Sequence, residues 1–300
     1  KMILQTIKQI SCLLCLCCFL QQSAFSQDDK DKPAYTLFDN TGKQISYGEL
    51  IKRLSGYDVI FLGELHNCPI THWLEFEITR SIYNIHKDQL MLGAEMFESD
   101  NQLIFDEYMQ QKISYDRFEA EARLWDNYRT DYYPVVFFAK EHHIPFIATN
   151  IPRRYANIVK NKGFEALDSL SEEAKRYIAP LPIDFEYDEA QSAAAFSMMN
   201  MMGGRRAGDN RKLAQAQAIK DATMGWFIAR NIKNKFLHIN GSYHSNRQGG
   251  IIPYLLRYRP NTSIVTVTSV RQESIRKLDD DHKGLADFYI CVPEDMVNSY

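Results

Sequence analysis

The chain has 300 residues, of which 45% are hydrophobic and 24% are charged, and its formal net charge is −3 at pH 7. This composition excludes a disordered chain, a collagen and a coiled coil, and the length is sufficient for one large core. A weakly acidic chain without a clustered basic face is a poor binder of nucleic acid, so we expect no nucleic-acid partner.

Residues 1–26 have the pattern of a secretory signal peptide. After a basic start, an apolar run extends from Ile10 to Leu20 and is too short to span a bilayer as a helix. Ala24 and Ser26 then form a small-x-small cleavage signal, which predicts cleavage before Gln27. The alternative is an N-terminal helix that is buried in the fold.

Four of the six cysteines lie in or beside this apolar run: Cys12, Cys15, Cys17 and Cys18. A lipoprotein would be acylated at one of them, but a small residue directly precedes only Cys12 (Ser11) and no clear lipobox is present, so the sequence does not favour lipidation. Only Cys68 and Cys291 would remain after cleavage, and they can pair only if their Cα atoms lie within about 7 Å of each other.

Short apolar runs alternate with helical patterns along the rest of the chain. Such runs are typical of strands buried on both faces of a parallel sheet. The predicted strands are Asp58–Leu62, Leu90–Ala94, Pro145–Thr149, Phe236–Ile239, Ser263–Thr268 and Asp287–Val292. Helical spacing recurs from Trp73 to Ile85 and from Leu213 to Ile228. The alternation predicts an α/β fold with a central, mostly parallel sheet flanked by helices.

Residues 151–210 contain no good strand pattern. They include two prolines, a methionine-rich patch and a Gly-Gly pair. We interpret this span as a helical insertion that caps the C-terminal edge of the strands. Residues 27–300 would then form one α/β domain that contains the insertion.

Polar clusters follow four of the predicted strands directly, at positions 63–66, 95–98, 150–154 and 241–244. The carboxyl ends of parallel strands line one edge of an open α/β sheet, where ligands bind. We therefore expect Glu64, His66, Glu95 and His244 to converge on one crevice. A glycine lies three residues before each histidine, and we interpret it as a tight turn that lets the histidine face the crevice.

This set of side chains suits a Zn²⁺, Fe²⁺ or Mn²⁺ site with an open position, with His66, His244 and Glu95 as ligands. His72 is a further candidate ligand, because it shares a helix face with Glu75. A metal-bound water with Glu64 as base would make the protein a hydrolase. The alternative is a structural cluster that caps helices and satisfies buried donors.

Asp221 interrupts an apolar helix stripe before the fourth strand, as Gln217 does one turn earlier. A buried carboxylate must be paired, so Asp221 is a candidate partner that orients His244 or His66. The alternative is a helix edge that is partly exposed.

Aromatic and methionine clusters favour a flat apolar ligand such as haem, whose iron a tyrosine or histidine can bind axially. One cluster contains Trp125, Tyr128, Tyr132 and Tyr133, and the other contains Met198, Met199, Met201 and Met202. For each cluster taken alone, the alternative is ordinary core packing.

The residues that carry these arguments also resemble those of a known family. The segment Val59–His72 (VIFLGELHNCPITH), followed by Glu75, resembles the opening motif of the ChaN-like family. Further resemblances, in family order over about residues 55–270, are Glu95-Met96-Phe97, Asn150-Ile151-Pro152-Arg153, Asp221-Ala222-Thr223-Met224 and Gly241-Ser242-Tyr243-His244.

The resemblance implies a bacterial haem-binding protein linked to iron uptake, often a lipoprotein of the outer membrane. It also implies haem binding through a tyrosine in a homodimer, with Tyr133, Tyr128 and Tyr243 as candidates. Arg153 and Asp221 are further candidates around the haem. We therefore expect an exported protein, periplasmic or associated with the outer membrane, that works with haem or iron transport machinery. The absence of a clear lipobox is a departure from the family's lipoprotein pattern.

The ChaN-like family belongs to a superfamily with the Tiki metalloproteases and the erythromycin esterases. The Tiki pattern of two GxxH motifs and a glutamate corresponds here to His66, His244 and Glu95. The resemblance thus keeps a metal-dependent hydrolase of peptidase or esterase type as the alternative function. A third interpretation is a scaffold protein with a vestigial crevice, since related folds host different functions.

Overall fold

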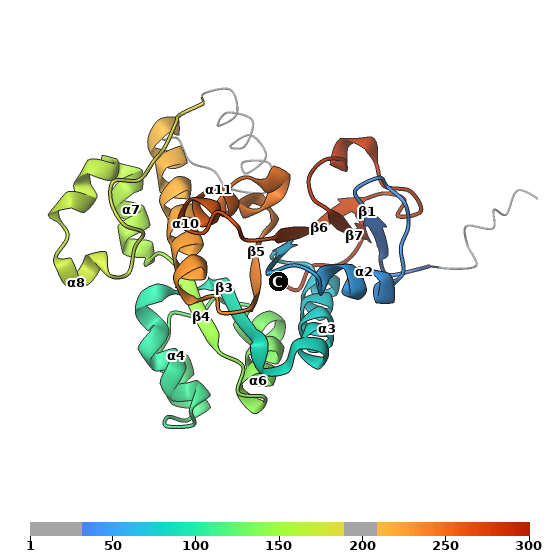
Figure 1. The fold of residues 1–300 in the computed structure, drawn as a ribbon, viewed down its shortest axis with the longest axis horizontal. Helices are drawn as coiled ribbons and strands as arrows, with labels where there is room; N and C mark the ends of the chain where they lie inside the picture. Colours follow the sequence, from blue (N-terminus) through green and yellow to red (C-terminus); the bar gives the residue numbers. More distant parts are fainter. Residues whose placement is uncertain (1–31, 189–208) are drawn as a thin grey trace, which may run out of the picture. The chain divides into compact units, whose positions relative to one another are not determined.

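A seven-stranded sheet runs through the protein, whose computed structural model describes residues 32–188 and 209–300 (Figure 1). The strands are β1 (Thr36–Asp39), β2 (Val59–Glu64), β3 (Leu90–Glu98), β4 (Phe146–Asn150), β5 (Lys235–Gly241), β6 (Ile264–Gln272) and β7 (Phe288–Pro293). Their order is β1-β7-β6-β2-β5-β3-β4, and only the β1–β7 pair is antiparallel. The predicted α/β fold with a mostly parallel sheet is confirmed, and β1 is an additional edge strand that the sequence analysis missed.

Helices cover both faces of this sheet (Figure 1). The described α-helices are α2 (Tyr47–Leu54), α3 (Pro69–His86), α4 (Gln102–Met109), α5 (Tyr115–Glu121), α6 (Tyr133–Glu141), α7 (Arg153–Lys162), α8 (Glu172–Lys175), α10 (Asn210–Asn231) and α11 (Ile251–Tyr258). Along β2, Ile60 and Leu62 pack into the core shared with α3 and α6. Val59 and Phe61 pack into the core shared with α10 and α11. This alternation explains the continuous apolar run, because both faces of the strand are buried.

The predicted apolar stripe on α3 is narrower than its sequence pattern suggested. Leu74, Ile78 and Ile82 are fully buried, whereas Trp73 and Ile85 are 48% and 52% exposed. Trp73 is rotated away from the face that carries the buried residues, and Ile85 lies in the last turn of α3, which ends at His86.

The described part of the predicted insertion, residues 151–188, is helical and packs beside α10 (Figure 1). Tyr155 and Val159 of α7 form a small core with Ala216 and Ile219 in the first half of α10. The methionine-rich patch and the predicted signal peptide lie outside the described residues.

Cys68 and Cys291 are buried free cysteines and do not form a disulfide. Among the helices that the structure describes, none is long and apolar enough to cross a bilayer.

At the amino ends of β2 and β6, Asp58 links the two strands. Its carboxylate accepts hydrogen bonds from the backbone N–H (2.9 Å) and the hydroxyl (2.8 Å) of Ser263. These bonds, the backbone one first, hold the pKa of Asp58 below its ordinary value. A lowered folded pKa stabilises the protein above the unfolded value of about 3.9, and that contribution is lost as the pH falls through the folded pKa.

We therefore expect Asp58→Asn to lower the free energy of unfolding by about 1 kcal/mol at neutral pH. The difference from wild type should shrink as the pH falls below about 4, because the wild-type carboxylate is then protonated. Urea unfolding at a series of pH values measures this, with the exposed Asp88→Asn as control. A difference that stays constant with pH would contradict the charge-based explanation.

Candidate functional site

The carboxyl ends of three neighbouring strands form the floor of the candidate site. β5 lies between β2 and β3, and Gly241 at its end is paired with Glu64 at the end of β2. On the other side, the ladder between β5 and β3 stops at Ala94. The next residue, Glu95, accepts a hydrogen bond from the backbone N–H of Gly241 through Oε2 at 2.8 Å. The expected convergence of Glu64 and Glu95 on one edge of the sheet is therefore present.

The two GxxH glycines provide space, and the predicted tight turn is wrong. Gly63 and Gly241 lie within β2 and β5, and neither has a positive φ angle. A Cβ atom on Gly63 would lie 3.0 Å from the Cα of Ser242. A Cβ atom on Gly241 would lie 2.8 Å from the ring of His66. Both positions lack room for a side chain, which is why the two histidine loops can approach each other.

His244 is held between two carboxylates. Its Nδ1 lies 2.5 Å from Oδ1 of Asp221, and its Nε2 lies 3.3 Å from Oε1 of Glu95. All three residues are buried. Asp221 projects from the middle of α10, so the polar interruption of that helix's stripe pairs with His244, one of its two predicted partners.

These contacts keep the His244 ring charged. Burial alone would lower its pKa, but Glu95 and Asp221 outweigh burial and raise the pKa of His244 to about 10. Conversely, although burial disfavours the anion, His244 and then His66 hold the pKa of Glu95 well below its ordinary value. Burial raises the pKa of Asp221, and His244 offsets part of that effect.

His66 lies at the opening of the site, with 37% of its side chain exposed. Its Nδ1 lies 2.5 Å from Oε1 of Glu64, and the hydroxyl of Tyr132 donates to the same oxygen at 2.7 Å. Burial lowers the pKa of His66, but Glu64 outweighs it, so the net shift is upward.

A second group of polar side chains lies behind His66. His72 Nδ1 is 3.1 Å from Oε2 of Glu75 and 3.6 Å from Oε2 of Glu64. His72 Nε2 is 3.1 Å from the carbonyl oxygen of His66 and 3.4 Å from Oδ2 of Asp131. Although burial opposes it, Glu75 and the other carboxylates raise the pKa of His72 to about 10. Burial, and then the nearby Glu64, raise the pKa of Glu75 well above its ordinary value.

Sequence reasoning missed Asp131 and Asn127, which complete this group. Asn127 donates to the carbonyl oxygen of His66 at 3.1 Å and to Oδ2 of Asp131 at 2.8 Å. Asp131 lies in a π-helical turn, Tyr128–Tyr132, which does not follow the ordinary helical period. The only available signal was the aspartate itself, which lies between Tyr128 and Tyr132 in a segment that we interpreted as an aromatic cluster.

The predicted metal ligands lie next to one another but do not form a compact ligand set. Within the described parts of the chain, the only three-residue group with ligand atoms all within 4.8 Å is Glu64, His72 and Glu75. The metal-binding role of His66, His244 and Glu95 therefore stays a prediction, as does the catalytic role of Glu64.

The three tyrosine candidates have different surroundings. Tyr128 is 2% exposed, and its hydroxyl is buried without a hydrogen-bond partner. Tyr133 packs its partly buried ring against Tyr115, 5.0 Å between centroids. Tyr243 is 44% exposed, and its ring lies 5.3 Å from that of His244. Tyr243 is thus the candidate that an external ligand can reach at the crevice.

Arg153 lies near the opening of the site, because Trp125 lies close to both His66 and Arg153. The indole of Trp125 lies 5.0 Å from the ring of His66 and 6.0 Å from the guanidinium of Arg153. The side chain of Arg153 is 68% exposed, and its Nε lies 3.5 Å from Oε1 of Glu98. We call the exposed or partly exposed side chains of Tyr243, His66, Trp125 and Arg153 the crevice rim.

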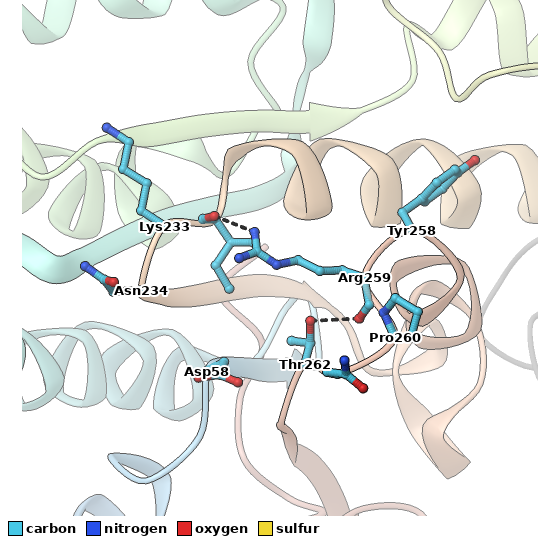
Figure 2. A pocket seen from close by; sticks show the side chains of 9 residues that line it. Asp58, Lys233, Asn234, Tyr258, Arg259, Pro260 and Thr262 are labelled. Carbon is cyan, nitrogen blue, oxygen red and sulfur yellow. Dashed lines mark hydrogen bonds between the residues drawn. The ribbon is translucent and has the colours of Figure 1, made fainter.

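A separate pocket lies at the opposite, amino ends of β2, β5 and β6 (Figure 2). Two of its polar side chains bond to the chain's own backbone. Arg259 donates to the carbonyl oxygen of Ile232 at 2.6 Å, and Thr262 donates to that of Arg259 at 2.9 Å. We assign no function to this pocket, because Arg259 and Thr262 bond to the chain's own backbone (Figure 2).

Residues 50–255 match the family model described as haem-binding uptake, Tiki superfamily, ChaN. The chain belongs to this family. The match spans the strand ends, the GxxH loops and α10, so every element that builds the candidate site lies inside it.

Among solved structures, ChaN of Campylobacter jejuni, described with cofacially bound haem, has a TM-score of 0.65 and 20% identity, covering 90% of this chain and 98% of that chain. A protein from Bacillus cereus has a TM-score of 0.49 and 11% identity, covering 87% and 95%. A mutant erythromycin esterase in its open conformation has a TM-score of 0.46 and 12% identity, covering 86% and 83%. The first of these supports the fold. No curated protein matches the chain.

The Asp221–His244 pair generates a prediction. Asp221→Asn leaves the buried imidazolium of His244 with one anionic partner, so we expect the free energy of unfolding to fall by about 3 kcal/mol at neutral pH. A raised folded pKa stabilises the protein fully below the unfolded value of about 6.5, and the wild type loses this contribution as the pH rises through about 10. In the variant the loss should begin at lower pH.

Chemical unfolding from neutral to alkaline pH measures this effect, with Asp168→Asn as an exposed control. If wild type and Asp221→Asn lost stability in parallel as the pH rose, His244 would be neutral in the native state.

Proposed function

We propose that this member of the ChaN family binds haem at the crevice rim and serves haem or iron acquisition. The observation that carries the proposal is that Tyr243 is exposed beside His244, at the carboxyl edge of the sheet. Next to this tyrosine, His244 is buried in ion pairs with Glu95 and Asp221. Because Tyr243 is exposed, an external iron atom could reach its phenol without unfolding of the core.

The rest of the rim offers the contacts that a porphyrin uses. The partly exposed Trp125 gives an aromatic surface next to His66. Arg153 supplies an exposed guanidinium, and this group pairs well with a carboxylate such as a haem propionate. A tyrosine is an established axial ligand of haem iron in proteins. Asp221 lies behind His244 and would act by orienting it, without touching the haem.

The cellular part of the proposal rests on the sequence. The basic start, the apolar run and the small-x-small signal support export, with the protein in the periplasm or at the outer membrane of a bacterium. There it would pass haem or iron to transport machinery. A homodimer is part of the same proposal, since an exposed rim leaves one haem face open to a second copy.

A metal-dependent hydrolase has less support from the geometry. Within the described residues, the ligand atoms of His66, His244 and Glu95 do not form a compact three-residue group.

Haemin titration of the chain from Gln27 onward tests the proposal, since this form retains the compact unit Tyr35–Tyr300. We expect a saturable, shifted Soret band. Tyr243→Phe should weaken haemin binding about tenfold or more and change the Soret position, because the phenol oxygen is lost from the iron. Arg153→Ala should weaken binding without moving the band, because its guanidinium would pair with a propionate and not with the iron.

The matched control is Tyr128→Phe, which removes a hydroxyl buried in the aromatic core. It should bind haemin as wild type does. A flat titration of the wild type would refute the haem proposal, and a spectrum unchanged in Tyr243→Phe would refute this tyrosine as the ligand.

A further inference from the structure

A buried cluster of polar side chains, called the pocket below, lies behind the crevice rim. It is formed by Glu64 at the end of β2 and by His72 and Glu75 on α3, whose side chains are 0%, 4% and 1% exposed. One ligand atom from each residue lies within 4.8 Å of the other two. His72 Nδ1 lies 3.1 Å from Oε2 of Glu75 and 3.6 Å from Oε2 of Glu64, and these distances are compatible with bonds of about 2.0 to 2.2 Å to one central ion.

The contacts of Nε2 of His72 leave Nδ1, the second ring nitrogen, facing two carboxylates. Nε2 lies near two acceptors, the carbonyl oxygen of His66 and Oδ2 of Asp131, so Nε2 carries a hydrogen. In the neutral ring, Nδ1 then has a lone pair directed toward Oε2 of Glu75 and Oε2 of Glu64. Three electron-rich atoms would then meet, so either a proton on Nδ1 or a cation between the three atoms must fill this position.

Two carboxylate oxygens in the pocket have no hydrogen-bond donor. They are Oε2 of Glu64 and Oε1 of Glu75. The other oxygen of Glu64 already accepts from Tyr132 and contacts His66. A buried acceptor without a partner is costly and calls for a bound group.

The charges around the pocket do not balance. Three buried carboxylates (Glu64, Glu75 and Asp131) contact two imidazoles (His66 and His72). With both imidazoles charged and all three carboxylates ionised, one negative charge would remain, so either a proton on one carboxyl group or a bound cation must neutralise it. A divalent cation would remove this excess without requiring His72 to be charged.

We propose that Glu64, His72 and Glu75 bind one divalent transition-metal ion in this pocket, separate from the haem at the rim. An imidazole nitrogen with carboxylate oxygens is a donor set that Zn²⁺, Mn²⁺ and Fe²⁺ accept. The Nε2–H of His72 bonds to the backbone and faces Asp131, as is usual for the second nitrogen of a metal-bound histidine. The ion joins α3 to the end of β2 and thereby fixes Glu64, to which His66 at the rim is bonded.

The test uses the haem-free chain from Gln27 onward, unfolded and refolded with either Zn²⁺ or a chelator, because the pocket is buried in the native state. We expect about one retained zinc ion per chain and a higher unfolding midpoint than after refolding with chelator. Glu75→Gln should weaken zinc retention about tenfold or more and abolish the gain in midpoint. Glu77→Gln is the matched control on the same helix, where Glu77 pairs with Arg80, and it should behave as wild type.

A proton shared by Glu75 and Glu64 is the competing occupant. The glutamine of Glu75→Gln would replace it, since its amide donates to Glu64 as a protonated carboxyl would. No retained zinc in wild type, or an equal zinc-dependent gain in Glu75→Gln, would therefore overturn the proposal. So would loss of zinc in Glu95→Gln with retention in Glu75→Gln, because the ion would then lie in the crevice.

A second measurement needs no variant. Wild type refolded with Co²⁺ should show visible d–d absorption of a protein-bound ion, and a spectrum identical to that of free Co²⁺ would overturn the proposal. Since no step involves haem, failure of the haemin titration leaves this test unaffected.

Discussion

The hydrogen bond from the backbone N–H of Gly241 to Oε2 of Glu95 joins β5 to β3 at the point where their ladder has ended. It fixes one oxygen of the carboxylate, and the other oxygen then meets Nε2 of His244. The same glycine has no Cβ, so His66 can pack directly against the strand end. One residue without a side chain thus permits both histidine loops to reach the same edge of the sheet.

Burial of charge governs everything built on that edge. A carboxylate or imidazolium that leaves water needs a partner of opposite charge, and each buried one here has such a partner. His244 lies between Glu95 and Asp221, and His72 lies near three carboxylates. In the first group, Asp221 contacts His244, and Glu95 contacts His244 and accepts from the N–H of Gly241. In the second group, Oε2 of Glu64 and Oε1 of Glu75 are buried without a donor, which is why this group points to a bound cation.

Much of the fold was accessible from the sequence because strands buried on both faces are continuous apolar runs. The predicted strand ends were less accurate. The sequence analysis ended these strands at Leu62 and Ala94, whereas β2 continues to Glu64 and β3 continues to Glu98. In the sequence, a polar side chain after an apolar run indicates that the strand has ended. Here the polar residues still belong to the strands and carry the candidate site. The edge strand β1 was missed because four residues carry too little periodicity.

The sequence predicted which residues form the site better than it predicted which of them contact each other. Strand-end position identified Glu64, His66, Glu95 and His244, and the broken helix stripe identified Asp221. Sequence could not decide whether Asp221 would face His66 or His244, because that depends on how α10 is rotated against the sheet. It could not rank the tyrosines either, since the exposure of Tyr243 and the burial of Tyr128 arise from tertiary packing.

The two oxygens of Glu64 separate the surface of the site from its interior. Oε1 contacts His66 at the rim and accepts from Tyr132, whereas Oε2 faces His72 in the buried pocket. A ligand on the rim and an ion in the pocket would therefore share this one carboxylate while occupying different spaces. Because its side chain is completely buried, Glu64 cannot turn to water when either side changes. The position of His66 at the rim consequently depends on what fills the pocket behind it.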